Sequence, residues 1–183
     1  MENVAVFGGS FDPPTIGHVM VVSHLLLNEP EIDQVWVVPC YLQAGKTLTD
    51  FSHRLEMCKA AFNWLPRVAI SEAERNLGGE SITARTIKAL WDSYPRCKFR
   101  FVMGSDLLDK VNTWEGWDVV KELAPPLVIG RAGIAGGGGQ TPICPLVSST
   151  IVREALKKKE YWTAGRYLPA QVTQYIMDNS LYL

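Results

Sequence analysis

Short apolar runs alternate along the chain with longer segments in which apolar residues recur at helical spacing. An apolar run bounded by turn residues predicts a buried strand, and an i, i+3, i+4, i+7 spacing predicts a helix. The expected strands are Val4–Phe7, Gln34–Pro39, Val68–Ile70, Phe99–Met103 and Leu127–Ile129. The expected helices are Gly17–Leu27, Ser52–Asn63, Ser81–Trp91, one holding Trp117, Val120 and Leu123, then Ser149–Lys159 and Pro169–Asn179.

This alternation predicts an α/β fold, a Rossmann-like parallel sheet with helices on both faces. The chain has 183 residues and shows neither a repeat nor a linker, so we expect a single domain over residues 1–183. Ligands of such sheets lie outside the carboxyl ends of the strands, so residues that follow strands are the functional candidates. The glycine-rich stretch Gly133–Pro142 is expected to be a flexible loop.

Composition narrows the class of protein further. A formal net charge of −1 gives no electrostatic footprint for nucleic acid or a membrane surface. No apolar run approaches the length of a membrane span, and the first residues lack the basic region of a signal peptide. The cysteines Cys40, Cys58, Cys97 and Cys144 are too widely spaced for a zinc site or a disulfide framework. Free thiols and the missing signal peptide predict a cytoplasmic protein.

The first candidate site is the string GGSFDPPTIGH, residues 8–18, between the first strand and the first helix. Gly8 and Gly9 allow a ligand to approach the backbone closely, and the amides that open the helix suit a phosphate. His18 lies in the first helical turn, where its ring can donate to an anionic oxygen, and Thr15 adds a hydroxyl nearby. Glycine follows glycine directly, so this is not the G-x-G-x-x-G dinucleotide fingerprint.

The second candidate site is the string VSSTIVR, residues 147–153, at the start of a later helix. Ser148, Ser149 and Thr150 supply donors where the helix dipole favours an anion. Arg153 follows one turn later and can fork onto two phosphate oxygens. Taken alone, the string is as well explained as a helix cap followed by a surface arginine.

A third segment, Gly45-Lys46-Thr47, has the form of the end of a Walker A loop. The first glycine of that motif would fall on residue 40, which is Cys40, so a P-loop is excluded. Lys46 is instead a candidate phosphate contact in the loop after the second strand, and its competing explanation is an exposed loop lysine.

The first two strings together resemble the nucleotidyltransferase superfamily, with its signatures G-x-F-[DS]-P-x-[HT]-x-G-H and I-S-S-T-x-[IV]-R. The resemblance implies that His18, Lys46 and Arg153 are catalytic. It also implies ATP-binding roles for Gly8, Gly9, Ser10, Phe11, Thr15, His18, Gly104, Asp106, Ser148, Ser149, Thr150 and Arg153. Residues 53–57 (HRLEM), 80–83 (ESIT), 101–106 (FVMGSD) and 114–117 (WEGW) are similar to the nicotinate- and nicotinamide-mononucleotide adenylyltransferases in particular.

That narrower resemblance implies transfer of AMP from ATP to a mononucleotide, with Mg²⁺ bridging the phosphates and no residue assigned as a metal ligand. The acceptor is expected to contact Thr83, Trp117 and Arg131, with Trp117 stacking on the pyridine ring and Trp114 packing in the core. Thr15 stands where these enzymes usually have histidine, and Ile82 replaces an aromatic residue. A phosphopantetheine-type adenylyltransferase and a non-catalytic nucleotide sensor are the alternatives. The sequence leaves open the acid or amide form of the acceptor and is compatible with a homo-oligomer.

Overall fold

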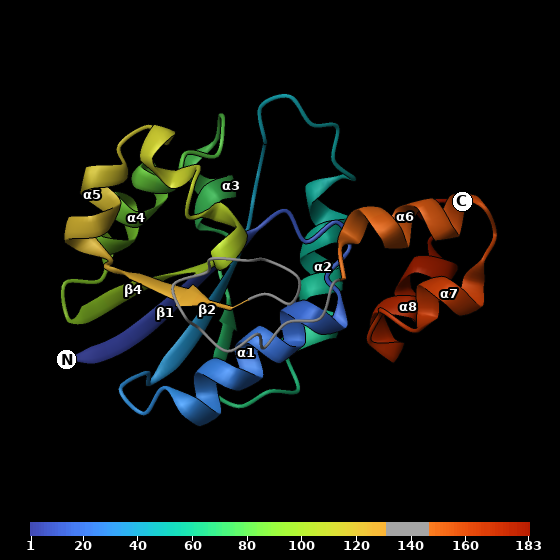
Figure 1. Ribbon diagram of the computed structural model, residues 1–183, viewed down its shortest axis with the longest axis horizontal. Coiled ribbons are helices and arrows are strands. Elements are labelled where there is room, and N and C mark those ends of the chain that lie inside the picture. The colour runs from blue at the N-terminus through green and yellow to red at the C-terminus, as the bar shows by residue number, and fades with distance from the viewer. Residues whose placement is uncertain (131–146) are drawn as a thin grey trace.

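In the computed structural model, which describes residues 1–130 and 147–183, five strands form one parallel sheet in the order β3-β2-β1-β4-β5. This confirms the predicted Rossmann-like architecture (Figure 1). The strands are β1 (Glu2–Gly9), β2 (Gln34–Pro39), β3 (Val68–Ile70), β4 (Cys97–Gly104) and β5 (Pro126–Ile129).

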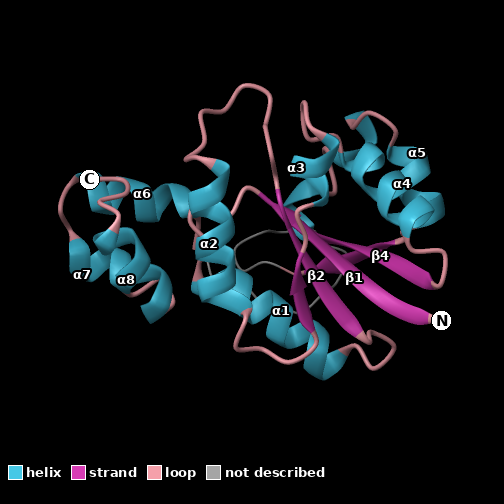
Figure 2. Cartoon of the chain, turned by 180° about the vertical axis from the view of Figure 1, so that it is seen from behind, coloured by secondary structure: helices cyan, strands magenta, loops and turns pink. Residues whose placement is uncertain are grey.

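Helices lie on both faces of the sheet, and the last three form a separate group beside it (Figures 1 and 2). The helices are α1 (Ile16–Asn28), α2 (Phe51–Phe62), α3 (Ala73–Leu77), α4 (Thr83–Ser93), α5 (Trp117–Leu123), α6 (Ser149–Lys157), α7 (Tyr161–Gly165) and α8 (Ala170–Asp178). Two 3₁₀ turns, η1 (Ser105–Leu107) and η2 (Val111–Thr113), connect β4 to α5. In the part of the chain that is described, no helix is long and apolar enough to cross a membrane.

The buried residues of β1 alternate between two hydrophobic cores. Ala5 packs with α1, α2 and the C-terminal helices on one face, whereas Val4 and Val6 pack with α4 and α5 on the other. This alternation follows from the two-residue period of a strand, whose successive side chains point to opposite faces. A central strand covered on both faces is accordingly apolar throughout, as the sequence predicted.

Several local predictions were wrong. Helix α2 begins at Phe51, one residue before the predicted start, and is capped by Asp50, whose carboxylate accepts a hydrogen bond from the backbone N–H of Ser52 at 2.8 Å. Helices α3 and α7 were missed because five residues are too few to show a helical period. The predicted loop Gly133–Pro142 lies outside the described residues.

The strand order reverses direction at β1, because β2 pairs on one side of it and β4 on the other. In open α/β sheets a ligand crevice forms at such a switch point, outside the carboxyl ends of the strands. Here those ends are Gly9 of β1 and Gly104 of β4. The two glycines thus mark where a functional site is expected.

Candidate active site

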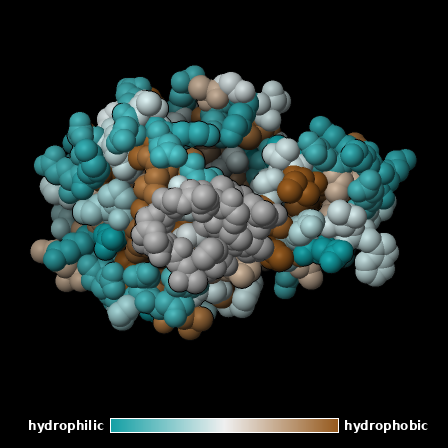
Figure 3. Space-filling view, in the orientation of Figure 1, coloured by the Kyte–Doolittle hydropathy of each residue, from teal (hydrophilic) through white to brown (hydrophobic). Residues whose placement is uncertain are grey.

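A cavity of about 590 Å³ opens at that switch point. Its walls come from the ends of β1 and β4, the start of α1, the loop after β2, and the segments around α3, α4 and η2. Of the residues expected at the site, it is lined by Gly8, Gly9, Ser10, Thr15, His18, Thr83, Gly104 and Asp106. On the face shown in Figure 3, hydrophobic residues gather toward the middle of the molecule and hydrophilic residues toward its edges.

His18 lies in the first turn of α1 and is held by Thr15, the N-cap of that helix. Its Nδ1 atom is 2.9 Å from the backbone nitrogen of Thr15 and 2.9 Å from the Thr15 hydroxyl. A backbone N–H can only donate, so Nδ1 accepts, and a neutral ring must carry its proton on Nε2. The local fold therefore makes His18 a donor through Nε2, the form that suits an anionic ligand.

The Phe11 side chain packs beneath this loop and is not among the residues that line the cavity. Its side chain is 1% exposed, and its ring centroid is 5.1 Å from that of His18. A Cβ atom added at Gly9 would lie 3.1 Å from the Phe11 ring, so Gly9 allows the strand end to pass over the ring. Phe11 of the FDP string thus has a packing role beneath the backbone of the strand end.

At the end of β4, Asp106 folds back over Gly104. A Cβ atom at Gly104 would be 2.3 Å from the Asp106 carboxylate oxygen Oδ1, far too close for any side chain. The glycine is therefore required for this carboxylate to sit at the strand end, where both residues line the cavity. The GSD string predicted the placement of both residues correctly.

The second motif lies against the first, although 128 residues (19–146) lie between them in the chain. Ser148 caps α6 by accepting from the Ile151 N–H at 3.3 Å. The Ser149 hydroxyl donates to the carbonyl of Pro13 at 2.7 Å. Arg153 Nη1 donates to the carbonyl of Asp12 at 2.6 Å. The two motifs therefore form one unit, while Ser148, Ser149, Thr150 and Arg153 stand beside the cavity rather than among the residues that line it.

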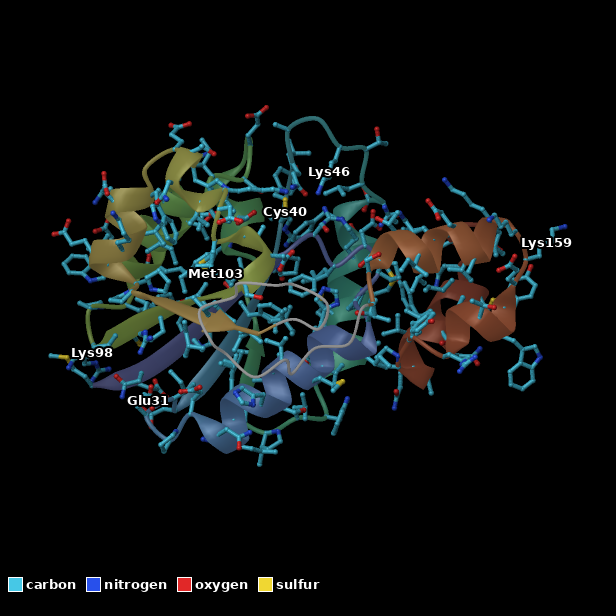
Figure 4. The ribbon with its side chains drawn as sticks, viewed as in Figure 1. Glu31, Cys40, Lys46, Lys98, Met103 and Lys159 are labelled. Carbon is cyan, nitrogen blue, oxygen red and sulfur yellow. The ribbon has the colours of Figure 1, made fainter. Side chains whose placement is uncertain are left out.

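Lys46 belongs to the exposed loop between β2 and α2 and is not among the lining residues (Figure 4). The base of this loop is fixed by Arg54, which is 1% exposed. Its guanidinium donates to the carbonyls of Ser10, Cys40 and Tyr41 at 3.0, 2.5 and 3.0 Å. Arg54 thus joins the loops after β1 and β2, and burial raises the pKa of the neighbouring Cys40 thiol.

The opposite wall of the cavity is polar and centred on Glu74. Its carboxylate accepts from the Tyr41 N–H at 3.1 Å and from the Thr86 hydroxyl at 3.1 Å. The Ser81 hydroxyl accepts from the same Tyr41 N–H at 2.9 Å. Glu74 therefore ties the loop after β2 to α4 and fixes the wall that also contains Thr83.

Trp114 packs against the core on this face, as expected, but Trp117 does not take the place expected of it. Trp117 is 9% exposed and belongs to the core formed with α4, so its burial argues against stacking on a ligand. Trp114 lines the cavity. The inward position of Trp117 follows from Gly116, whose backbone is left-handed at φ 69°. A Cβ atom added to Gly116 would lie only 2.6 Å from the Cβ atom of Ala84. The close approach seats α5 on α4 and turns Trp117 inward.

Charge is distributed unevenly around the cavity. Among its described lining residues, the acidic ones are Glu74, Asp106 and Glu115, and none is a lysine or an arginine. The cationic candidates Lys46 and Arg153 are not among the lining residues. Arg131, the third, lies outside the described residues. No group of three or more metal-ligating His, Cys, Asp or Glu residues occurs within residues 1–130 and 147–183.

Comparison with known proteins decides the family. The cytidylyltransferase-like family matches residues 6–155, a span that contains both motifs, the end of β1 and all of β2, β3, β4 and β5. The chain belongs to the cytidylyltransferase-like family. The resemblance to nucleotidyltransferases that the two motifs carry is thereby confirmed, and the chain is a nucleotidyltransferase.

Within the family, the similar proteins share one name. A probable nicotinate-nucleotide adenylyltransferase of Anaeromyxobacter dehalogenans (strain 2CP-C) is 36% identical over 99% of this chain and 97% of its own length. The nicotinate-nucleotide adenylyltransferase of Bacillus subtilis (strain 168) is 29% identical over 100% of this chain and 99% of its own. Both relatives therefore align with this chain over nearly the whole length of each protein.

Solved structures agree on the fold. The nicotinic acid mononucleotide adenylyltransferase of Plasmodium falciparum, complexed with NaAD, superposes with a TM-score of 0.79 at 23% identity, covering 100% of this chain and 98% of its own. A putative nicotinate-nucleotide adenylyltransferase from Vibrio parahaemolyticus gives 0.75 at 22% identity, with coverage of 100% and 96%. The cytidylyltransferase-like fold is therefore shared over the whole chain.

Sequence reasoning assigned no role to three residues that shape the site. Glu74 lies on the short helix α3, where no periodicity was visible. Arg54 stood in a recognised string, but its burial beneath two loops had no signal in the sequence. Trp114 was expected only in the core, because the resemblance assigned ring stacking to the second tryptophan of residues 114–117.

Proposed function

We propose that this protein transfers AMP from ATP to nicotinate mononucleotide and releases pyrophosphate. One observation carries the proposal: a single cavity brings the His18 end of the first motif together with a second, differently built wall containing Thr83 and Trp114. One end suits a polyphosphate, and the other suits a flat ring attached to a sugar that bears hydroxyl groups. The names of the relatives, all nicotinate-nucleotide adenylyltransferases, support this choice of acceptor.

The chemistry requires little from the protein beyond positioning. A phosphate monoester has a second pKa of about 6, so the acceptor is largely a dianion at neutral pH and needs no general base. One of its oxygens attacks the α-phosphorus of ATP in line, forming a new P–O bond as the bond to the β-phosphate oxygen breaks. The electron pair and negative charge leave with pyrophosphate. Groups that stabilise this developing charge supply the catalysis.

We assign that stabilisation to His18, Lys46 and Arg153. The hydrogen bonds to Thr15 support His18 as an Nε2 donor at the start of α1, where the helix dipole also favours an anion. Arg153 has donors in addition to the one used on Asp12. Lys46 lies on the loop between β2 and α2, and Arg54 fixes only the base of this loop. Movement of the loop tip would bring the Lys46 ammonium group to the phosphates.

We further propose that Mg²⁺ arrives with ATP. Mg²⁺ prefers oxygen ligands and is commonly held by substrate phosphates with one or two carboxylates. Asp106 is the carboxylate at the strand end in the cavity and would be the protein's contribution. The ion supplies charge neutralisation on the phosphates, which fits a cavity whose described lining contains no lysine or arginine. EDTA should abolish turnover, and added Mg²⁺ should restore it.

We place the reaction in the cytoplasm as catalysis on small molecules, which the net charge of −1 and the free thiols of Cys40, Cys58 and Cys97 support. The deciding experiment mixes the protein with ATP and, separately, nicotinate mononucleotide, nicotinamide mononucleotide or phosphopantetheine. Pyrophosphate release and dinucleotide formation are followed by chromatography. We expect the pyridine mononucleotides to react and phosphopantetheine to react much more slowly. Faster reaction with phosphopantetheine would reject the proposed acceptor, and no reaction with any of them would favour a nucleotide sensor.

A further inference from the structure

Asp12, inside the first motif, is a buried carboxylate held by groups from distant parts of the chain. Its side chain is 2% exposed. Oδ1 accepts from the Tyr182 hydroxyl at 2.6 Å, and Oδ2 accepts from the Thr49 N–H at 3.2 Å. Hydrogen bonds to an ionised carboxylate are among the strong ones, so these contacts fix the position of Asp12.

The backbone of the same residue holds the arginine of the second motif. The Asp12 carbonyl accepts from Arg153 Nη1 at 2.6 Å, while Arg153 Nη2 is 3.3 Å from the Thr150 hydroxyl oxygen. The direction of the guanidinium therefore depends on where the Asp12 peptide lies. Because the Asp12 carboxylate is anchored by Tyr182, the tyrosine is linked to Arg153 through one intervening residue.

Tyr182 is well suited to a fixed role of this kind. The chain after α8 returns to the side of α6, so that its end lies beside that helix (Figures 1 and 2). Burial and the neighbouring Asp12 raise the pKa of the Tyr182 phenol, so its hydroxyl stays protonated and donates. The same hydroxyl oxygen is 3.9 Å from the Met57 sulfur, so it lies between α2 and the loop that carries Asp12.

We propose that Tyr182 is a positioning residue for ATP: through Asp12 it fixes the carbonyl that orients Arg153 toward the phosphates. Tyr182 and Asp12 are not among the residues lining the cavity, whereas the neighbouring Gly9, Ser10 and Thr15 are. The tyrosine thus acts on the phosphate-binding loop from behind. The inference rests on the proposed function only in taking ATP as the ligand.

The test compares Tyr182→Phe with Tyr175→Phe, a matched loss of one hydroxyl. The Tyr175 hydroxyl is 3.0 Å from His53 Nδ1, in the same C-terminal group of helices but away from Asp12. Binding of a non-hydrolysable ATP analogue is measured by calorimetry, well below both melting temperatures. We expect about tenfold weaker binding for Tyr182→Phe, as for loss of a hydrogen bond to a charged group, and less than twofold change for Tyr175→Phe.

The same substitution made in an Arg153→Ala protein distinguishes a positioning role from a general destabilisation of the fold. If Tyr182 acts through Arg153, Tyr182→Phe should weaken binding no further in an Arg153→Ala protein. An equal loss in both backgrounds, or unchanged binding in the otherwise wild-type protein, would overturn the proposal. If Tyr182→Phe does not fold, Asp12→Asn replaces it, because it removes the charge at nearly the same shape and should show the same dependence on Arg153.

These measurements read ATP binding and need no acceptor. A failure of the proposed acceptor in the transfer assay therefore leaves the test intact, and a failure here leaves the transfer reaction standing.

Discussion

The two ends of the cavity are built in different ways. The phosphate end uses contiguous residues, with backbone amides, glycines and His18 following one strand within residues 8–18. The acceptor end gathers Glu74 from α3, Thr83 and Thr86 from α4, and Trp114 after η2. Backbone recognition of a phosphate needs one turn of chain, whereas recognition of a ring and its substituents needs side chains from several elements. The first kind of site is therefore recognised as one string, whereas the second is found only in part, through Thr83 in residues 80–83 and a tryptophan in residues 114–117.

The largest effect should come from the phosphate end. We expect His18→Ala to lower kcat by about 10²–10³, the usual cost of removing a donor that acts mainly in the transition state. The melting temperature should fall only slightly. His24→Ala is the control, because His24 lies on the same helix with its ring at Asn28 and Glu29. Near-normal turnover in a folded His18→Ala protein would reject the assignment.

Arg153→Ala should weaken ATP binding by about 10- to 100-fold, since hydrogen bonds to charged groups contribute about 1.5–3 kcal/mol. Arg153→Lys should recover only part of this loss, because lysine keeps the charge but not the bidentate fork. Lys157→Ala on the exposed side of α6 is the matched control. Titration of ATP by calorimetry decides the matter, and wild-type affinity in Arg153→Ala would reduce the second motif to a helix cap.

The tryptophan pair tests the acceptor end. Trp114→Ala should raise KM for the mononucleotide by about 2- to 13-fold and leave KM for ATP unchanged, because ring stacking contributes about 0.5–1.5 kcal/mol. Trp117→Ala should instead lower the free energy of unfolding by about 3–5 kcal/mol. Steady-state kinetics and denaturant melts on both variants distinguish the roles. The opposite assignment of effects would restore the sequence-based expectation for Trp117.

The smallest effect is expected at Thr15. Thr15→Ala removes the hydroxyl at His18 Nδ1 but keeps the backbone N–H at 2.9 Å from the same atom. We therefore expect kcat/KM for ATP to fall by only about fivefold, consistent with one neutral hydrogen bond. Thr15→Ser should restore it. Nitrogen NMR of the histidine ring should find Nε2 protonated in both proteins, and a proton on Nδ1 would contradict the capping geometry.

The sequence predicted the sheet, the five strands and the first motif because each depends on local patterns. The place of His18 follows from its position three residues after a helix cap. The side that Trp117 faces does not, because it depends on the left-handed turn at Gly116 and the close contact with Ala84. Arg54 could be read as part of a string, but its hydrogen bonds to four backbone carbonyls form only where the loops after β1 and β2 meet. Long-range assembly, not local propensity, decided these cases.

The pairing of β1 with β4 has a consequence for how the protein reaches its native state. Val4 lies opposite Phe99, 95 residues further along the chain. Contacts of such long range are slow to form, because the entropy of closing the intervening loop is lost before the contact stabilises anything. The crevice for ATP lies at the ends of these two strands, so it cannot exist until they meet. During synthesis, binding competence must therefore wait for β4, however early the first motif leaves the ribosome.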